Sequence, residues 1–279
     1  MKTDLELKEL VREKYAEIAN QDKETNMSSC CGSGSCSTEV YNIMSEDYTK
    51  IEGYAVDADL GLGCGIPTEH ALLAPGQTVI DLGSGAGNDC FIARSFVGES
   101  GKVIGIDFTQ EMIDKARINA DNLGYNNVEF RFGDIEKMPV AADRADVVVS
   151  NCVLNLVPNK KNVINEIFRV LKPGGHFSIS DVVLKGILPT ELQNAAEMYA
   201  GCVSGAIQKE EYLQFIQEAG FKNILVQKEK VINIPNDILS KYLDENALNE
   251  FETKGQGIFS ITVYAEKPEA CCTPGGGCC

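Results

Sequence analysis

The sequence predicts an α/β protein with a doubly wound sheet of about seven strands. From Gln77 onward, short apolar runs alternate with helical patterns. That alternation is typical of parallel strands joined by right-handed crossovers. The chain has 279 residues, which is enough to bury one large core with appendages, because single cores stop growing near about 250–300 residues.

Seven segments have the length and apolar content of strands. The first five are Thr78–Leu82, Lys102–Ile106, Val128–Phe132, Ala145–Ser150 and Gly175–Ser180. The last two are Phe221–Gln227 and Ile258–Ala265, after a helix over Lys209–Ala219 that Gly220 ends. Apolar residues at helical spacing from Leu7 to Ile18 indicate an amphipathic surface helix in the first twenty residues.

The chain divides into four predicted regions. Residues 1–40 hold the N-terminal helix and a mobile cysteine-rich loop, and residues 41–181 form the cofactor-binding domain. Residues 182–267 carry two insertions, 182–208 and 228–256, with the strands that complete the fold. Residues 268–279 form a flexible cysteine-rich tail, because glycine and serine between the cysteines disfavour regular structure.

Charge and composition exclude several classes of partner. The formal net charge of -16 repels nucleic acid and anionic lipid, and no basic run offsets it. Met1–Leu10 lacks the apolar block of a signal peptide, and no apolar stretch reaches the roughly 18 residues of a membrane span. We therefore expect a cytoplasmic protein. Eleven cysteines indicate metal, metalloid or redox chemistry there, since stable cytosolic disulfides are rare.

A glycine-rich turn follows the first predicted strand. Its glycines, Gly83, Gly85 and Gly87, have the spacing G-x-G-x-G, whereas a nicotinamide fingerprint is G-x-G-x-x-G. Glycine allows the unusual φ/ψ of the turn and lets a ligand touch bare backbone. Asp81 comes two residues earlier and argues for a cationic ligand group instead of a phosphate. Asn88 follows the turn as a further candidate contact.

Later strand ends add further cofactor candidates. Asp107 lies twenty residues after Gly87, where a carboxylate accepts hydrogen bonds from both ribose hydroxyls, and Met112 follows on the next helix. Asp134 closes the third strand, where it meets an adenine amino group while Ile135 packs against the ring. With Leu-Lys-Pro-Gly-Gly at 171–175, these elements resemble the class I S-adenosylmethionine-dependent methyltransferases. The resemblance implies S-adenosylmethionine as cofactor, and an NAD-binding Rossmann domain is the alternative.

Cysteines occupy the positions expected to face the methyl group. Ligands of open α/β sheets sit beyond the carboxyl ends of the strands. The fourth strand ends there at Asn151-Cys152, so Asn151 is a further candidate cofactor contact. Cys202 and Cys64 lie in two other loops, each with glycine beside the cysteine.

The stretch from Tyr41 to Gly220 resembles the arsenite S-adenosylmethionine methyltransferases. The matching motifs are Gly63-Cys64-Gly65, Asp81–Asp89, Ser150–Leu156 and Gly201–Ala206. The resemblance implies that Cys152 and Cys202 hold arsenic, and that Cys64 and one N-terminal cysteine are functional. Cys36 is favoured over Cys30 and Cys31 as that fourth cysteine. Around Cys202 the chain reads Ala-Gly-Cys-Val-Ser-Gly-Ala where the family has Gly-Glu-Cys-Leu-Gly-Gly-Ala.

Arsenic chemistry explains this set of residues. Trivalent arsenic binds three thiolates, and Cys64, Cys152 and Cys202 are the predicted ligands. Its lone pair attacks a sulfonium methyl without a general base, so catalysis rests on alignment. The chain's two histidines, His70 and His176, are accordingly expected to be structural. Arsenite or methylarsenite would be the substrate, and a thioredoxin- or glutathione-type thiol reductant would be the co-substrate and partner that the resemblance implies.

Two other functions compete with this interpretation. One is a methyltransferase of the same fold that acts on carbon or oxygen of a small metabolite, such as a quinone precursor. Its reaction would require an acid or base near the methyl group. A metal-sequestering protein would use the paired terminal cysteines but would have no need of the Asp residues of the cofactor motif. Cys90, on the helix after the glycine turn, is expected to be a small core residue.

Overall fold

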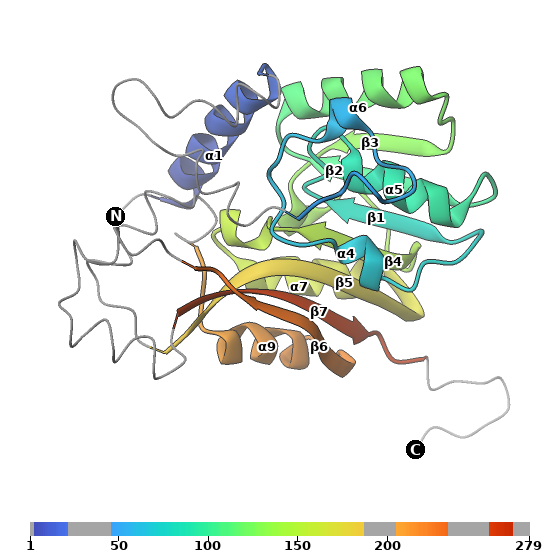
Figure 1. Ribbon diagram of the computed structural model, residues 1–279. Coiled ribbons are helices and arrows are strands. Elements are labelled where there is room, and N and C mark those ends of the chain that lie inside the picture. The colour runs from blue at the N-terminus through green and yellow to red at the C-terminus, as the bar shows by residue number, and fades with distance from the viewer. Residues whose placement is uncertain (1–2, 22–45, 187–204, 234–256, 270–279) are drawn as a thin grey trace, which may run out of the picture.

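The computed structural model describes residues 3–21, 46–186, 205–233 and 257–269. It has one seven-stranded sheet of order β3-β2-β1-β4-β5-β7-β6 (Figure 1), which confirms the predicted fold. The strands are β1 (Thr78–Leu82), β2 (Lys102–Asp107), β3 (Val128–Phe132), β4 (Ala145–Asn151), β5 (Leu171–Lys185), β6 (Lys222–Val231) and β7 (Gly257–Glu266). β1 to β5 pair in parallel, and β7 runs antiparallel between β5 and β6.

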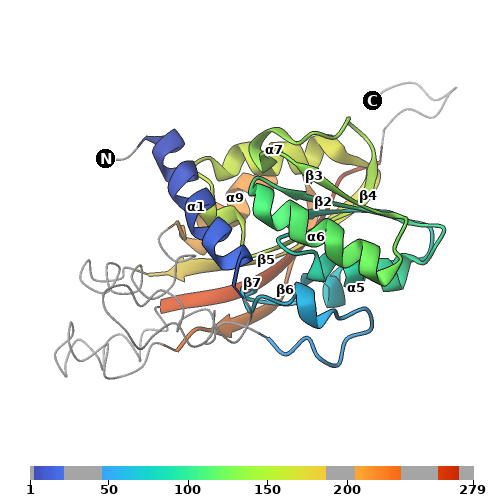
Figure 2. The same cartoon turned by 90° about the horizontal axis from the view of Figure 1, so that it is seen from above.

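Helices cover both faces of the sheet (Figures 1 and 2). One face packs against α4 (Pro67–His70), α5 (Asn88–Val97) and α6 (Gln110–Leu123), and the other packs against α7 (Lys160–Val170) and α9 (Lys209–Glu218). Alternating strand residues separate two cores, because successive side chains of a strand point to opposite faces. Ile80 and Leu82 of β1 face the α7 side, and Val79 faces α5. Asp81 therefore points toward α5 and the glycine turn.

The strand boundaries near the insertions differ from the prediction. β5 continues to Lys185 because Asp181, Val182, Val183 and Leu184 pair with β7. β6 likewise continues to Val231 by pairing with Phe259. The insertions predicted to begin at 182 and 228 were therefore placed too early at their N-terminal edges. These strands are longer because they pair with a strand distant in the sequence, and such pairing cannot be predicted from the local sequence pattern.

The N-terminal helix packs more closely against the rest of the protein than the surface helix that its sequence pattern predicts. α1 (Asp4–Ala19) begins with a capping box between Thr3 and Glu6. It packs on α6, as Figure 2 shows, and Ile18 and Ala19 are buried. Lys115 of α6 donates to the carbonyls of Ala19 and Gln21, at 3.0 and 3.3 Å. The C-terminal end of α1 is thereby held to the core of the α/β sheet.

Several predicted segments lie outside the described residues. They include the N-terminal cysteine loop with Cys30, Cys31 and Cys36, the tail with its cysteine pairs, and Cys202. Within the described ranges, no helix has the length and apolar content that would carry it across a membrane.

Candidate functional site

The glycine turn has the backbone that its sequence predicts. Gly83, Gly85 and Gly87 have φ values of 65°, 51° and 100°, in the left-handed region that favours glycine. A Cβ at Gly83 would lie 2.4 Å from a methyl carbon of Val153. The turn therefore brings bare backbone against the loop that follows β4.

Asp107 at the end of β2 is tied to this turn. Its Oδ2 accepts a hydrogen bond from the Gly85 amide at 3.0 Å, and its Oδ1 accepts one from the Thr109 amide at 2.8 Å. Burial raises the pKa of Asp107, and the amide hydrogen bonds of Thr109, Gly85 and Phe108 oppose that rise. The carboxylate is thus fixed at the strand end before any ligand binds.

Two more carboxylates lie near the turn, Asp81 buried and Asp89 half-buried. Burial, followed by the charge of Asp89, raises the pKa of Asp81 well above its ordinary range. The Cys90 thiol donates to Asp81 Oδ2 at 3.2 Å. Cys90 is buried as predicted, and it is also a hydrogen-bond partner of a candidate cofactor residue. A cationic ligand group would relieve the repulsion between these carboxylates.

Asn151 connects the pocket to the loop that carries Cys64. Its Oδ1 accepts from the Cys64 amide at 3.1 Å, and its Nδ2 donates to the Gly65 carbonyl at 2.8 Å and to Asp89 Oδ2 at 3.2 Å. The Tyr48 hydroxyl also donates to the Gly65 carbonyl at 2.8 Å. Because Asn151 directly precedes Cys152, one side chain fixes both cysteine-bearing loops.

Both described candidate cysteines of the acceptor site are buried. Cys64 is 1% exposed and Cys152 is 2% exposed. Cys152 has φ of 62°, a left-handed value that is uncommon for residues other than glycine. Its amide donates to the Ser180 carbonyl at 2.8 Å. No group of three histidine, cysteine or acidic residues able to hold a metal ion occurs in the described part of the chain, and Cys202 and Cys36 lie outside that part.

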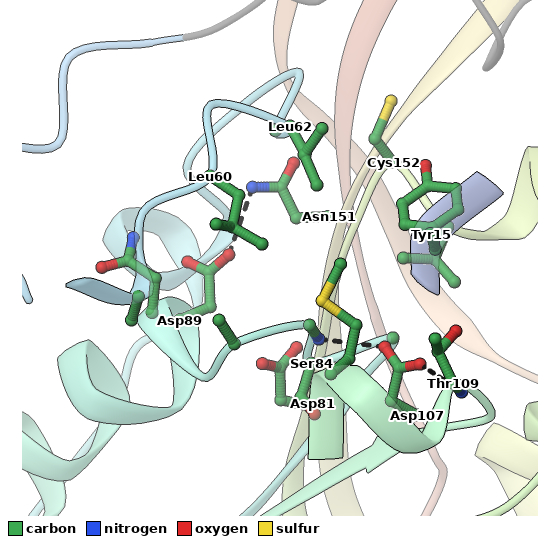
Figure 3. Close-up of a pocket in the computed structure, with 18 of the residues that line it drawn as sticks. Tyr15, Leu60, Leu62, Asp81, Ser84, Asp89, Asp107, Thr109, Asn151 and Cys152 are labelled. Atoms are coloured by element: carbon green, nitrogen blue, oxygen red, sulfur yellow. Dashed lines mark hydrogen bonds between the residues drawn. The ribbon is translucent and has the colours of Figure 1, made fainter. Parts of the chain in front are cut away.

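A pocket joins these residues at the carboxyl ends of the strands (Figure 3). Its empty space is about 800 Å³, open solvent included. In Figure 3, Asp81 and Asp107 lie near each other and Asn151 faces Asp89, while Cys152 and Tyr15 also line the pocket. The predicted cofactor residues that line it are Asp81, Gly83, Gly85, Asn88, Asp107, Met112 and Asn151. Gly87 is part of the same turn.

Asp134 and Ile135 line a smaller apolar recess that shares Gly83, Asp107 and Val153 with the main pocket. Lys8 of α1 lies there too, with its ammonium 2.6 Å from Asp134 Oδ2 and 3.1 Å from a Glu136 oxygen. The structure therefore brings every predicted cofactor residue to one region, together with Cys64 and Cys152.

Proteins named as arsenite methyltransferases align with most of this chain. Residues 73–220 match the family described as methyltransferase domain. The arsenite methyltransferase of Halobacterium salinarum is 41% identical over 276 residues, which is 94% of this chain and 67% of that protein. The chain belongs to the arsenite methyltransferase family.

Two further arsenite methyltransferase relatives agree with that membership. One, from Aquipseudomonas alcaligenes, is 32% identical over 85% of this chain and 68% of its own length. The other is the crystal structure of an arsenic(III) S-adenosylmethionine methyltransferase from Chlamydomonas reinhardtii. It superposes with a TM-score of 0.61 at 28% identity and covers 86% of this chain and 75% of that chain. The predicted class I methyltransferase fold is confirmed, and the NAD-binding alternative is set aside.

The arsenite methyltransferase pocket contains residues that the sequence pattern did not assign. Tyr15 and Lys8 come from α1, Tyr48 comes from a loop, and Asp89 follows Asn88 in the quoted motif. Of these four residues, only Asp89 could have been predicted from the sequence to line the pocket, because it directly continues the glycine turn. The other three lie far from any motif, and only the folded chain brings them to the site.

Proposed function

We propose that this protein transfers the methyl group of S-adenosylmethionine to the lone pair of trivalent arsenic bound by cysteine thiolates. The observation that carries the proposal is the buried Cys152, which lines the glycine-turn pocket, with the buried Cys64 next to Gly63, which lines it too. Asn151, directly before Cys152, accepts a hydrogen bond from the Cys64 amide. The names of the relatives support arsenite as the acceptor.

The pocket supports a specific orientation of S-adenosylmethionine. Asp107 would accept hydrogen bonds from the ribose hydroxyls, since its carboxylate is already fixed at the end of β2. Asp81 and Asp89 would face the ammonium group of the methionine end. The adenine would enter the apolar recess beside Ile135, with its amino group near Asp134 and Lys8. That orientation directs the sulfonium methyl toward Cys152.

Three thiolates would hold arsenite, from Cys64, Cys152 and Cys202. Cys202 is only three residues before Gly205, a span of at most about 10 Å. Gly205 packs so closely on Asn155 that an added Cβ would lie 1.9 Å from the Asn155 carbonyl oxygen. Asn155 in turn is only three residues after Cys152. Chain length therefore permits Cys202 to reach the other two cysteines.

Catalysis would come from alignment of the arsenic lone pair with the methyl group and the leaving sulfur. No base is needed, because the nucleophile carries no proton. Methylation through the lone pair would leave arsenic formally pentavalent. By the family resemblance, Cys64 and an N-terminal cysteine such as Cys36 would then reduce it back to the trivalent state by giving up two electrons and closing a disulfide, which a thioredoxin- or glutathione-type reductant would reopen. A cytoplasmic location would suit this cycle, since thiols are kept reduced there.

Labelled S-adenosylmethionine tests the proposal. The label is expected in methylated arsenicals when the reduced protein is incubated with arsenite and excess thiol. A set of phenols and quinone precursors serves as the comparison. Label transferred to those acceptors but not to arsenite would support the carbon or oxygen methyltransferase instead. Transfer to neither would favour the metal-sequestering function.

The affinity for S-adenosylmethionine is expected to depend on pH through Asp89. Burial raises the pKa of Asp89 to about 6, against the hydrogen bonds from Asn151 and Tyr48 that lower it. The carboxyl is therefore neutral below about pH 6 and loses its attraction for the ammonium group. Affinity should fall by up to about tenfold per pH unit below that value. Calorimetric titrations from pH 5 to 8 measure it, and an Asp89→Asn variant should show a flatter profile. Equal slopes in the two proteins would remove Asp89 from the ammonium site.

A further inference from the structure

The loop that carries Cys64 is held from two sides. On the sheet side, Ser260 Oγ of β7 donates to the Cys64 carbonyl at 2.7 Å, and Ser178 Oγ of β5 donates to the Pro67 carbonyl at 2.9 Å. Neither serine lines the cofactor pocket. On the pocket side, the Gly65 carbonyl accepts from two side chains that do line it. These two contacts give the cofactor pocket a route to the Cys64 loop.

The two side chains, Tyr48 and Asn151, have fewer protons to donate than acceptors within reach. The Tyr48 hydroxyl has one proton, and its oxygen lies 2.8 Å from the Gly65 carbonyl oxygen and 3.3 and 3.4 Å from the two Asp89 oxygens. The Asn151 amide has two protons. Its Nδ2 lies 2.5 Å from the Tyr48 hydroxyl, 2.8 Å from the Gly65 carbonyl oxygen and 3.2 Å from Asp89 Oδ2. The Gly65 carbonyl and the Asp89 carboxylate therefore compete for the same protons.

Tyr48 keeps its proton in this position. The residue is 6% exposed, and burial, followed by the charge of Asp89, raises the pKa of its phenol well above the ordinary value. The hydroxyl is therefore a donor at neutral pH, to the Gly65 carbonyl or to Asp89. The methyl transfer proposed above does not use it.

We propose that Tyr48 is a positioning residue that couples occupation of the cofactor pocket to the placement of Cys64, so that S-adenosylmethionine raises the affinity for arsenite. This inference rests on the proposed function. When the ammonium group of the cofactor binds Asp89, the carboxylate gains a charged donor and competes less for Tyr48 and Asn151. Their protons then go to the Gly65 carbonyl, which holds the neighbouring Cys64 in place. Because such coupling is reciprocal, arsenite raises the affinity for the cofactor by the same factor.

The coupling should be specific to arsenite. Arsenite takes a third thiolate, which Cys64 supplies in the proposed function, whereas monomethylarsenite is held by Cys152 and Cys202. A contact that acts only through the placement of Cys64 should therefore leave the binding of monomethylarsenite independent of the cofactor. The two arsenicals thus report on the same protein with and without a contribution from Cys64.

Calorimetric titration with sodium arsenite, with and without saturating S-adenosylhomocysteine, tests the coupling. S-adenosylhomocysteine carries the ammonium group but has no methyl group to transfer, so no turnover disturbs the equilibrium. The heat measured with a Cys152→Ser variant is subtracted to remove binding at other cysteines. S-adenosylhomocysteine should lower the wild-type Kd for arsenite by about fivefold, the effect of one hydrogen bond, and that of Tyr48→Phe by less than about twofold. Monomethylarsenite should respond by less than about twofold in both proteins.

Matched controls separate positioning from a general structural role. Tyr264→Phe removes the hydroxyl of another buried tyrosine, which donates to Glu266 Oε1 at 2.7 Å and not to the Cys64 loop, and should keep the wild-type response. In a Cys64→Ser background, Tyr48→Phe should cause no further change in the response to S-adenosylhomocysteine. Each response compares one protein with itself, so general destabilisation cancels.

The possible results distinguish failure of the coupling from failure of the proposed function. An equal response in the wild type and Tyr48→Phe, or no response in the wild type, overturns the coupling. Weaker arsenite binding by Tyr48→Phe to the same extent with and without S-adenosylhomocysteine also overturns it, because Tyr48 then has a packing role alone. If the wild type shows no Cys152-dependent binding of either arsenical, the proposed function itself is wrong.

Discussion

Replacement of Cys152 by serine is expected to abolish methylation of both arsenite and monomethylarsenite, with a loss of at least about 1000-fold in turnover. An alcohol does not ionise near neutral pH and binds trivalent arsenic poorly, so the acceptor is no longer held at attack distance from the methyl group. Cys202→Ser should have the same effect. Turnover of each variant on both acceptors, with excess thiol present, measures it.

The Cys152→Ser substitution should impair binding of the arsenical and leave binding of S-adenosylmethionine intact. Serine is nearly the size of cysteine, and the Cys152 amide can still donate to Ser180, so calorimetric affinity for S-adenosylmethionine should stay within about twofold. Cys90→Ser is the matched control, because Cys90 is buried but contacts Asp81 on the cofactor side. It should retain methylation of both acceptors. Substantial activity of Cys152→Ser on either arsenical would show that the arsenic site lies elsewhere.

Cys64→Ser is expected to discriminate between the same two acceptors. Arsenite offers three positions to thiolates, whereas monomethylarsenite offers two, which Cys152 and Cys202 would fill. Loss of the third ligand should therefore reduce turnover on arsenite by about 100-fold or more, while turnover on monomethylarsenite falls much less. The ratio of the two rates is the measurement, because it cancels general damage to the protein.

Backbone contacts around Cys64 make this variant a clean test. The Cys64 amide binds Asn151, and its carbonyl accepts from Ser260 Oγ at 2.7 Å, so the loop is held independently of the thiol. Equal loss on the two acceptors would refute the ligand count, and full activity on arsenite would remove Cys64 from the site. Cys36→Ser should resemble Cys64→Ser if those two cysteines close the disulfide, unless Cys30 or Cys31 substitutes.

Local patterns were sufficient for most of the fold. The strands β1 and β3 match their predicted bounds, because each is a short apolar run between clear turn signals. β5 and β6 are exceptions, since each continues beyond its predicted end by pairing with β7, and for β5 that partner comes more than 70 residues later. Such pairing follows from the tertiary structure, so Val182–Lys185 was predicted to begin an insertion.

Site residues could be predicted where a sequence motif fixes the backbone. They could not be predicted where tertiary packing brings a residue to the pocket. The glycine turn and Asp107 were found because phosphate-free cofactor binding needs glycine and a strand-end carboxylate at set spacing. Tyr48 and Lys8 reach the pocket from segments whose residues are ordinary in sequence. Asn151 was found as a cofactor candidate, but its hold on the Cys64 loop depends on contacts across more than 80 residues.

The left-handed backbone of Cys152 limits which residues that position accepts. Glycine would suit φ of 62° best, and a β-branched residue would be strongly disfavoured. A side chain with a Cβ in this conformation costs on the order of 1 kcal/mol or more. If folding alone governed the position, glycine would be the expected residue. If Cys152 binds arsenic as proposed, its thiol is kept at a cost in backbone strain, and a Cys152→Gly variant should relieve that strain but lose activity.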